Sequence, residues 1–204
     1  MKTNPARRPQ AERRRDTQRK LTNAVVRCLD QLGYAQTSIT AVQEAAGVSR
    51  GAVLHHFPSK LELIAGTAKV LLTQALERTQ DAEPWRGATS VEELVVHYWR
   101  TVVDTPAGRA YLEILGACRT DEELRAAVQE VVEEWESGLT SAALERFIGR
   151  PMPTKPDDVV ALWGMCRSFL RGLLLDMSVD SQRSEQQVRL FARLLSTHLR
   201  LRDE

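Results

Sequence analysis

The chain of 204 residues lacks several features that would place it in a specialised class of protein. Its three cysteines, Cys28, Cys118 and Cys166, are odd in number and far apart, which is unlike a disulfide framework or a zinc-ligand pattern. Glycine (11 residues) and proline (8 residues) are too scarce for a low-complexity or collagen-like chain. No apolar stretch approaches the roughly 18 residues that span a bilayer, and the basic N-terminus lacks the apolar segment of a secretory signal. We therefore expect a cytoplasmic protein with no membrane partner, rather than a membrane protein, a secreted mini-domain or a disordered chain.

Charge is distributed unevenly, although the whole chain carries a formal net charge of only +1. Residues 1–60 hold eleven basic and four acidic side chains, a net charge of +7, whereas residues 61–204 carry −6. A basic quarter on an acidic body indicates a polyanionic partner for that quarter alone. Within it, residues 1–15 could equally be a basic tail that aids solubility, because a run of charge specifies no geometry.

Apolar residues recur at helical spacing along almost all of the chain after residue 20, as in Leu21, Val25, Cys28 and Leu32. No pair of alternating runs joined by a hairpin turn is present in the sequence. With 43% hydrophobic residues the chain can bury a real core. The pattern predicts an all-α fold of about nine helices, with short helices first and long helices after them. The expected helices cover residues 21–32, 38–47, 50–56, 59–79, 91–104, 107–117, 121–148, 157–177 and 185–201.

Four segments of the form Ser/Thr-x-x-Glu/Gln predict where helices begin. They start at Ser59, Ser90, Thr120 and Ser184. In this motif the hydroxyl accepts a hydrogen bond from a free backbone N–H of the first helical turn, so each residue is an expected N-cap.

The segment from Thr37 to Phe57 predicts two short helices joined by a tight turn. Ser38 can cap a first helix that Gly47 ends, because glycine tolerates the positive φ of such a turn. Ser49 can cap a second helix, which Pro58 prevents from continuing. Apolar side chains would pack the two helices together, namely those of Val42, Ala46, Val48 and Val53. Two short helices in this arrangement, next to a basic flank, are typical of a helix–turn–helix that reads the DNA major groove.

Residues 47–51 (Gly-Val-Ser-Arg-Gly) and 56–60 (His-Phe-Pro-Ser-Lys), followed by a long apolar helix, resemble the tetracycline-repressor (TetR) family of bacterial transcriptional regulators. The resemblance covers roughly residues 20–65, and the rest of the chain agrees only in length and helical character. It implies a sequence-specific DNA-binding regulator that forms a homodimer on a pseudo-palindromic operator in double-stranded DNA. Repression, relieved by a small apolar or aromatic effector, is the default in the family.

The same resemblance implies a division of the chain into three parts. A basic flexible tail would cover residues 1–15, and a three-helix DNA-binding domain with the helix–turn–helix would cover residues 16–62. Residues 63–204 would form a helical domain for effector binding and dimerisation. By the family pattern, the last two helices of two copies meet in a four-helix bundle.

Matching positions imply which side chains face DNA, and Arg50 is the strongest candidate because a guanidinium can bind guanine O6 and N7 together. Gly51 and Ala52 would let the helix backbone approach the groove, and Lys60 matches the lysine with which the family grips phosphate. Two positions depart from the family pattern: Gln43 replaces a small residue, and Leu54 replaces a tyrosine that touches phosphate. The expected DNA-binding residues are Ser38, Thr40, Gln43, Ser49, Arg50, Gly51, Ala52, Leu54, His55 and Lys60.

The middle of the chain carries the aromatic and soft side chains, including all four tryptophans. Such side chains usually form ordinary core, but helix-walled apolar cavities with few polar anchors are also common small-molecule sites. Because the resemblance implies a cavity among these helices, we expect an effector site there. Its expected residues are His97, Tyr98, Arg100, Tyr111, Cys118, Trp135, Trp163 and Arg167.

Two other functions compete with a DNA-binding regulator. An enzyme is disfavoured because the sequence has no nucleophile elbow, P-loop, zinc-protease or dinucleotide motif, so no catalytic residue, metal ligand or cofactor is expected. A helical protein–protein adaptor that keeps the helix–turn–helix as a scaffold is the remaining alternative. Sequence-selective DNA binding separates it from a regulator, because an adaptor would lack that property.

Overall fold

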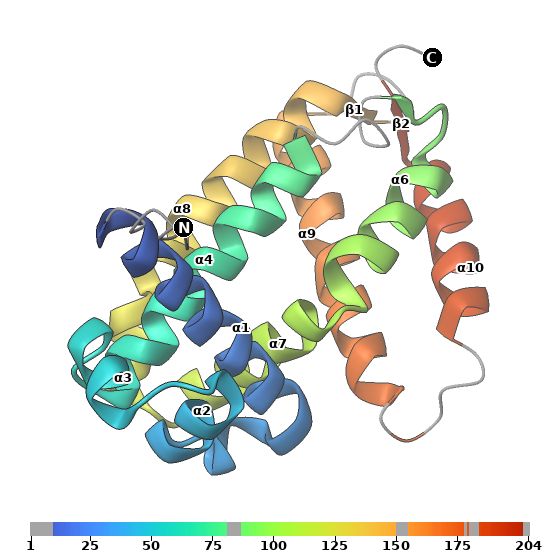
Figure 1. Cartoon of the computed structure of the whole chain (residues 1–204). Helices are drawn as coiled ribbons and strands as arrows, with labels where there is room; N and C mark the ends of the chain where they lie inside the picture. Colours follow the sequence, from blue (N-terminus) through green and yellow to red (C-terminus); the bar gives the residue numbers. More distant parts are fainter. Residues whose placement is uncertain (1–9, 81–86, 150–154, 178, 180–183, 202–204) are drawn as a thin grey trace, which may run out of the picture.

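The computed structural model describes residues 10–80, 87–149, 155–177, 179 and 184–201. Its first half contains the helices α1 (Gln10–Gln36), α2 (Ile39–Ala46), α3 (Arg50–His56) and α4 (Lys60–Gln80). The second half contains α6 (Val91–Tyr98), the π-helical turn η1 (Trp99–Val103), α7 (Pro106–Cys118), α8 (Glu122–Arg146), α9 (Pro156–Asp176) and α10 (Ser184–Ser196). The predicted all-α fold is therefore confirmed (Figure 1). None of the described helices combines the length and the apolarity that a membrane span requires.

Helix α1 begins at Gln10, well before the first residue of the apolar stripe from which we predicted it. Residues 10–15 are thus helical and not part of the flexible tail predicted for residues 1–15, while residues 1–9 lie outside the described residues. Gly33, with φ of 75°, interrupts the helical backbone where the sequence predicts the helix to stop.

Side-chain caps begin several helices at the residues that the sequence predicts, although the predicted cap Ser184 is itself the first helical residue of α10. Ser59 Oγ accepts a hydrogen bond from the backbone N–H of Glu62 (3.1 Å), and Ser90 Oγ accepts one from Glu93 (3.2 Å). The prediction for α8 is wrong by one residue, because the cap is Asp121 rather than Thr120. The Asp121 carboxylate accepts from the N–H of Leu124 (2.9 Å) and suits the positive end of the helix dipole better than a hydroxyl does.

A short antiparallel pair of strands replaces the ends of two predicted helices. Strand β1 (Phe147–Gly149) pairs with β2 (Leu199–Leu201), with Phe147 opposite Leu201. The sequence predicts helix through Ile148 and through Leu201. The structure ends these helices early because Phe147, Leu199 and Leu201 bury their side chains in the core from an extended backbone.

Buried apolar residues form two main cores. The N-terminal core joins α1–α4 to α7 and the first half of α8, and includes Leu29, Val53, Ile114 and Leu124. The C-terminal core joins α6, η1, α9, α10 and the strands around Trp163. Helix α8 packs along α4, and α2 and α3 lie on the side of the molecule opposite α10 (Figure 1). The N-terminal core therefore extends beyond the helix–turn–helix into the helices that follow.

Candidate functional site

Local hydrogen bonds define the two short helices near the N-terminus. Ser38 Oγ accepts from the N–H of Ala41 (3.1 Å) at the start of α2, and Ser49 Oγ accepts from Ala52 (3.2 Å) at the start of α3. Between them Gly47 adopts the left-handed conformation, with φ of 65°, and its N–H bonds to the last carbonyls of α2. The predicted helix–turn–helix is therefore present, with both caps and the glycine turn in their expected roles.

Apolar packing and one arginine fix this unit to the rest of the domain. Val42 of α2 and Val53 of α3 are fully buried, and Phe57 follows α3 into the same core. Arg27 of α1 donates a hydrogen bond to the carbonyl of Ala45 (2.6 Å) at the end of α2. A cation is favourable there because the helix C-terminus carries partial negative charge. The orientation of α3 is thus set by contacts on its inner side.

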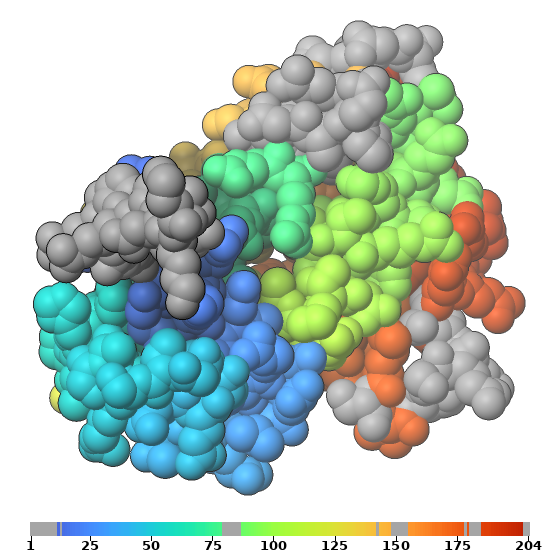
Figure 2. All heavy atoms as spheres, viewed as in Figure 1, coloured from blue at the N-terminus to red at the C-terminus, as the bar shows by residue number. Residues whose placement is uncertain are grey.

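The opposite side of the unit presents polar and small residues to solvent. Arg50 is exposed on the first turn of α3, and its Nη1 lies 3.5 Å from Thr40 Oγ1 on α2. The structure also exposes Ser38, Ser49, Gly51, Leu54 and His55, and leaves Gln43 and Ala52 half-buried. Figure 2 shows the α2 and α3 region as an outer surface of the molecule. The residues predicted to face DNA on these two helices are therefore exposed or half-exposed, and Arg50 lies beside Thr40.

Lys60, the first residue of α4, has a partner inside the protein. Its Nζ donates to the carbonyl of Tyr34 (3.0 Å) and lies 4.3 Å from the centroid of the Tyr34 ring. Burial lowers the pKa of Lys60, although nearby Asp121 opposes that shift. In the same cluster Tyr34 Oη donates to the Asp121 carboxylate (3.0 Å), and burial raises the pKa of Tyr34 to about 12. Lys60 thus ties α4 to the end of α1, a structural role that sequence reasoning missed.

The basic side chains that precede the apolar stripe project from the first turns of α1. Arg14, Arg15 and Arg19 are exposed, and Arg19 pairs with Asp16 (3.3 Å). The adjacent His55 and His56 of α3 have ring centroids 5.6 Å apart in an edge-on arrangement, and burial lowers the pKa of His56. In the part of the chain that the structure describes, no three His, Cys, Asp or Glu residues gather as metal ligands.

An apolar pocket lies between α4, the α6–η1 segment, α7, α8 and α9. The pocket is narrow and partly open to solvent. Three predicted effector residues, Tyr98, Tyr111 and Trp135, line it. The other lining residues are Leu71, Leu72, Gln74, Ala75, Arg78, Val102, Val103, Ala107, Gly108, Leu112, Arg171 and Leu174. The α4 residues and Arg171 were not predicted, because nothing local in the sequence distinguishes them from other helix-face residues.

Three other predicted effector residues lie in the packed interior. Trp163 is fully buried, and its ring contacts those of Tyr98 and Phe147 at centroid distances of 5.4 and 5.3 Å. Cys118 is buried in the N-terminal core, where burial raises the pKa of its thiol. Arg167 is buried beside the pocket, with its guanidinium carbon 5.4 Å from the Trp135 ring centroid.

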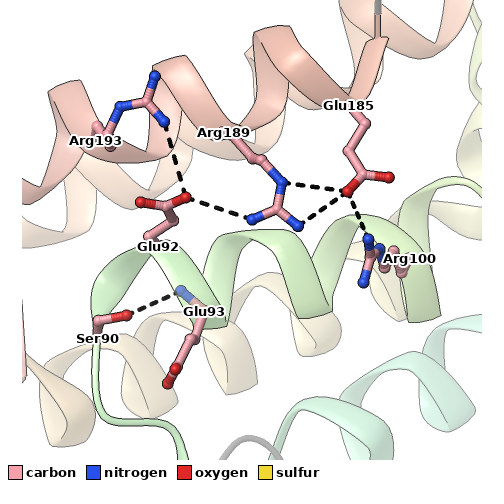
Figure 3. A network of polar contacts seen from close by, with 7 residues as sticks. All are labelled: Ser90, Glu92, Glu93, Arg100, Glu185, Arg189 and Arg193. Atoms are coloured by element: carbon pink, nitrogen blue, oxygen red, sulfur yellow. Dashed lines mark hydrogen bonds and ion pairs between the residues drawn. The ribbon is translucent and has the colours of Figure 1, made fainter.

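The last two predicted effector residues, His97 and Arg100, lie in a separate polar groove between the α6–η1 segment and α10. Figure 3 shows Arg100 directed at Glu185, which also binds Arg189 (3.0 Å). His97 lies beside Thr101, and burial lowers the pKa of its imidazole. The structure therefore does not bring these two side chains to the apolar pocket. Arg100 instead belongs to a network of ion pairs that joins η1 to α10.

The outer faces of α9 and α10 expose large apolar side chains. Met165 and Phe169 on α9 and Leu190 and Leu194 on α10 are all accessible, with Met165 65% exposed. Phe169 stacks on Phe191 with ring centroids 4.1 Å apart. An apolar surface shared by two adjacent helices is typical of an interaction site.

Comparison with known proteins gives a family match and relatives over most of the chain. Residues 21–67 match the model of bacterial regulatory proteins of the tetR family. The HTH-type transcriptional regulator CymR of Pseudomonas putida is 51% identical over 76 residues, which are 37% of this chain and 37% of that protein. The uncharacterized HTH-type transcriptional regulator Rv2912c of Mycobacterium tuberculosis is 26% identical over 181 residues, 86% of this chain and 93% of that one. The crystal structure of FadR from Bacillus subtilis with stearoyl-CoA has a TM-score of 0.66 at 16% identity, over 88% and 97% of the two chains, and shows the same fold.

Proposed function

The chain belongs to the TetR family of helix–turn–helix transcriptional regulators, and from that premise we propose that it represses transcription until a small apolar molecule releases it from its operator. The observation that carries the DNA-binding part is the accessible side of α2 and α3, which bears Arg50 beside Thr40. These residues lie within the segment that matches the family model. Repression is proposed as the sign of control because it is the default that the resemblance to the family implies.

Helix α3 would enter the major groove with its N-terminal half toward the bases. Arg50 supplies the donors for guanine, and Leu54 offers an apolar contact for a thymine methyl. Ser38 and Thr40 stand at the start of α2, where hydroxyls and free N–H groups can meet a phosphate. Gln43 and His55 would contact the backbone or a base edge beside them. Lys60 can offer phosphate only the protons that Tyr34 does not use.

A second copy of the chain would cover the apolar face of α9 and α10. Exposed Phe169, Leu190 and Leu194 give this face the apolar character of a homodimer interface. Two copies present two α3 helices, and a two-fold axis between them matches a pseudo-palindromic operator. The cytoplasm, where bacterial DNA is found, is the proposed place of action.

Helix α7 connects the proposed effector pocket to the DNA-binding helices. One side of α7 lines the pocket with Tyr111. Its other side grips α1, since Arg109 Nε donates to the Asp30 carboxylate (2.6 Å) and Glu113 accepts from the N–H of Tyr34 (2.9 Å). A ligand that favours one position of α7 therefore biases the position of α1 and with it the spacing of the α3 helices.

Selection of DNA from a random pool with the purified full-length chain tests this function. We expect the enriched sequence to be a pseudo-palindrome that is bound far more tightly than random DNA, with an affinity that falls as the salt concentration rises. Titration of the enriched sequence and of random DNA at two salt concentrations measures both the preference and the salt dependence. Weak binding with no enriched sequence would contradict the proposal and favour the adaptor.

A further inference from the structure

The wall of the apolar pocket contains polar atoms that the protein does not pair. Tyr111 of α7 and Trp135 of α8 both line the pocket, with ring centroids 5.7 Å apart. Among the described residues, neither Tyr111 Oη nor Trp135 Nε1 has a hydrogen-bond partner, and Trp135 is only 5% exposed. Unpaired buried polar groups are rare in folded proteins because leaving them unpaired costs free energy. The two groups are therefore available to a ligand that carries hydrogen-bond acceptors.

Positive charge accumulates next to these two groups. Arg167 of α9 is 7% exposed, and its guanidinium lies over the Trp135 ring. Within the described part of the chain, its Nε and Nη1 have no hydrogen-bond partner. The carboxylate of half-exposed Glu136 lies 3.6 Å from Nη1, which is an ion pair but too long for a good hydrogen bond. One turn along the helix, Arg171 lines the pocket itself.

The pKa of the Tyr111 side chain is consistent with this geometry. Burial raises the pKa of Tyr111 to about 12, while Arg171 and Arg167 act in the opposite direction and Glu136 acts with burial. The phenol thus stays protonated at neutral pH and can donate a hydrogen bond. Both arginines are also close enough to influence it electrostatically.

We propose that the ligand of this pocket is a monocarboxylic acid with an apolar body, whose carboxylate lies among Tyr111, Trp135, Arg167 and Arg171. The inference rests on the proposed function, since it assigns a chemical class to the effector of the same pocket. A carboxylate supplies several acceptor positions and one negative charge, which suits the donors of Tyr111, Trp135 and Arg167 that lack hydrogen-bond partners among the described residues, and the positive charge of the nearby arginines. Leu71, Leu72 and Leu174 would contact the apolar body. The two arginines would repel a cation, and a neutral ligand would form no ion pair with them.

Matched acid and amide pairs test the proposal on the full-length protein. The probes are 4-tert-butylbenzoate with its primary amide and octanoate with octanamide, titrated by calorimetry and by tryptophan fluorescence. We expect at least one acid to bind about tenfold or more tightly than its amide, because the charge-assisted contacts are lost in the amide. The aromatic and aliphatic pairs distinguish which type of apolar body the pocket accepts.

Two variants and a control test where the carboxylate binds. Arg171→Met is expected to lower the affinity for the acid about tenfold to a hundredfold and to leave the affinity for the amide unchanged. Tyr111→Phe is expected to lower the affinity for the acid about fivefold. The control is Arg125→Met, which removes an exposed arginine from α8 outside the pocket and leaves acid binding unchanged. Because Tyr111→Phe removes a single oxygen, it keeps the proposal falsifiable if Arg171→Met does not fold.

Failure of the proposed ligand class can be distinguished from failure of the proposed function. The proposal of a carboxylate ligand would be overturned if amides bound as tightly as acids. It would also be overturned if the acids bound Arg171→Met and Tyr111→Phe as tightly as they bind wild type. Absence of binding by both acids would overturn it as well. Operator titration with the same preparation reports separately on DNA recognition. A neutral ligand that binds in the pocket and releases operator would keep the proposed function while contradicting this inference.

Discussion

The two functional regions of the molecule place their polar side chains in opposite directions. In the helix–turn–helix, Val53 closes an apolar interior and Arg50 faces solvent. In the pocket, Tyr111 and Trp135 turn polar atoms inward, and Arg167 is buried next to them. The first region therefore suits a partner outside the molecule, whereas the second suits a partner that enters it.

A polar junction lies between the two regions. Arg109 of α7 pairs with Asp30 of α1 (2.6 Å) and with Asp104 beyond η1 (3.0 Å), while Asp30 is largely shielded from solvent. These contacts bind the pocket-lining helix to the helix that supports α2 and α3. Substitutions in these regions should therefore affect the reading of DNA, the coupling of the regions or stability alone.

The largest expected effect belongs to Arg50→Ala in the outward-facing region. Each guanidinium bound to guanine contributes about 1–3 kcal/mol, so a dimer would lose about 2–6 kcal/mol of operator binding. The melting temperature should stay unchanged because Arg50 is exposed. Titration of the selected operator measures the loss, with Arg125→Ala as the control. Operator affinity equal to that of wild type would show that α3 does not read DNA through Arg50.

Arg109→Met should weaken the junction and the communication across it. The free energy of unfolding is expected to fall by about 1–2 kcal/mol, a value that allows for the partial exposure of Arg109 and for Asp30 left unpaired. Urea unfolding measures this change. Arg125→Met, which removes an exposed pair with Glu122, should change it by less than about 0.5 kcal/mol. If ligand still released operator from Arg109→Met as it does from wild type, the junction would not transmit the signal.

Gly51→Ala should separate stability from DNA binding. Nothing lies within 4 Å of a β-carbon added at Gly51, so alanine is expected to stabilise the helix by about 0.5–1 kcal/mol. Operator affinity should nevertheless fall, because the added methyl group occupies space that the DNA needs. Thermal unfolding and operator titration check the two parts. A variant that is more stable and binds operator as tightly as wild type would contradict the close approach of α3.

Asp121→Asn should produce the smallest change, visible as a dependence on pH. The N–H of Leu124, and then Tyr34, lower the pKa of Asp121 in the folded protein. A carboxyl whose folded pKa is depressed contributes stability above its unfolded pKa, about 3.9, and this contribution is lost as pH falls. The melting temperatures of wild type and variant should therefore differ at pH 7 and converge toward pH 3. A difference that stays constant over this range would argue against the ionised cap.

The helix–turn–helix could be predicted because its determinants are local. Ser38, Gly47 and Ser49 each act within one helical turn of their own position, and Pro58 ends α3 by its own covalent structure. A hydroxyl N-cap indicates the start of a helix, and a glycine with positive φ indicates its end, whatever the fold around them. Asp121 shows the limit of such signals, since two adjacent residues could cap α8 and the structure uses the charged one.

The pocket and the strands could not be predicted in the same way because they depend on distant pairs. Tyr111 and Trp135 meet only after α7 and α8 have packed, and Arg171 comes from a third helix. Phe147 faces Leu201 across a two-stranded pair whose members are separated by two whole helices. Their apolar spacing is equally compatible with a continued helix. The sequence indicated that aromatic side chains gather in this half without indicating which of them face a cavity.

The most direct test of coupling between the pocket and α3 is the affinity of the selected operator with and without a saturating acid ligand. If the pocket and α3 are coupled through α7, saturation should lower operator affinity by a coupling free energy of about 1–3 kcal/mol. By linkage, operator should lower the affinity of the acid by the same factor. Operator affinity that is unchanged while calorimetry shows the pocket occupied would contradict the coupling of the two regions.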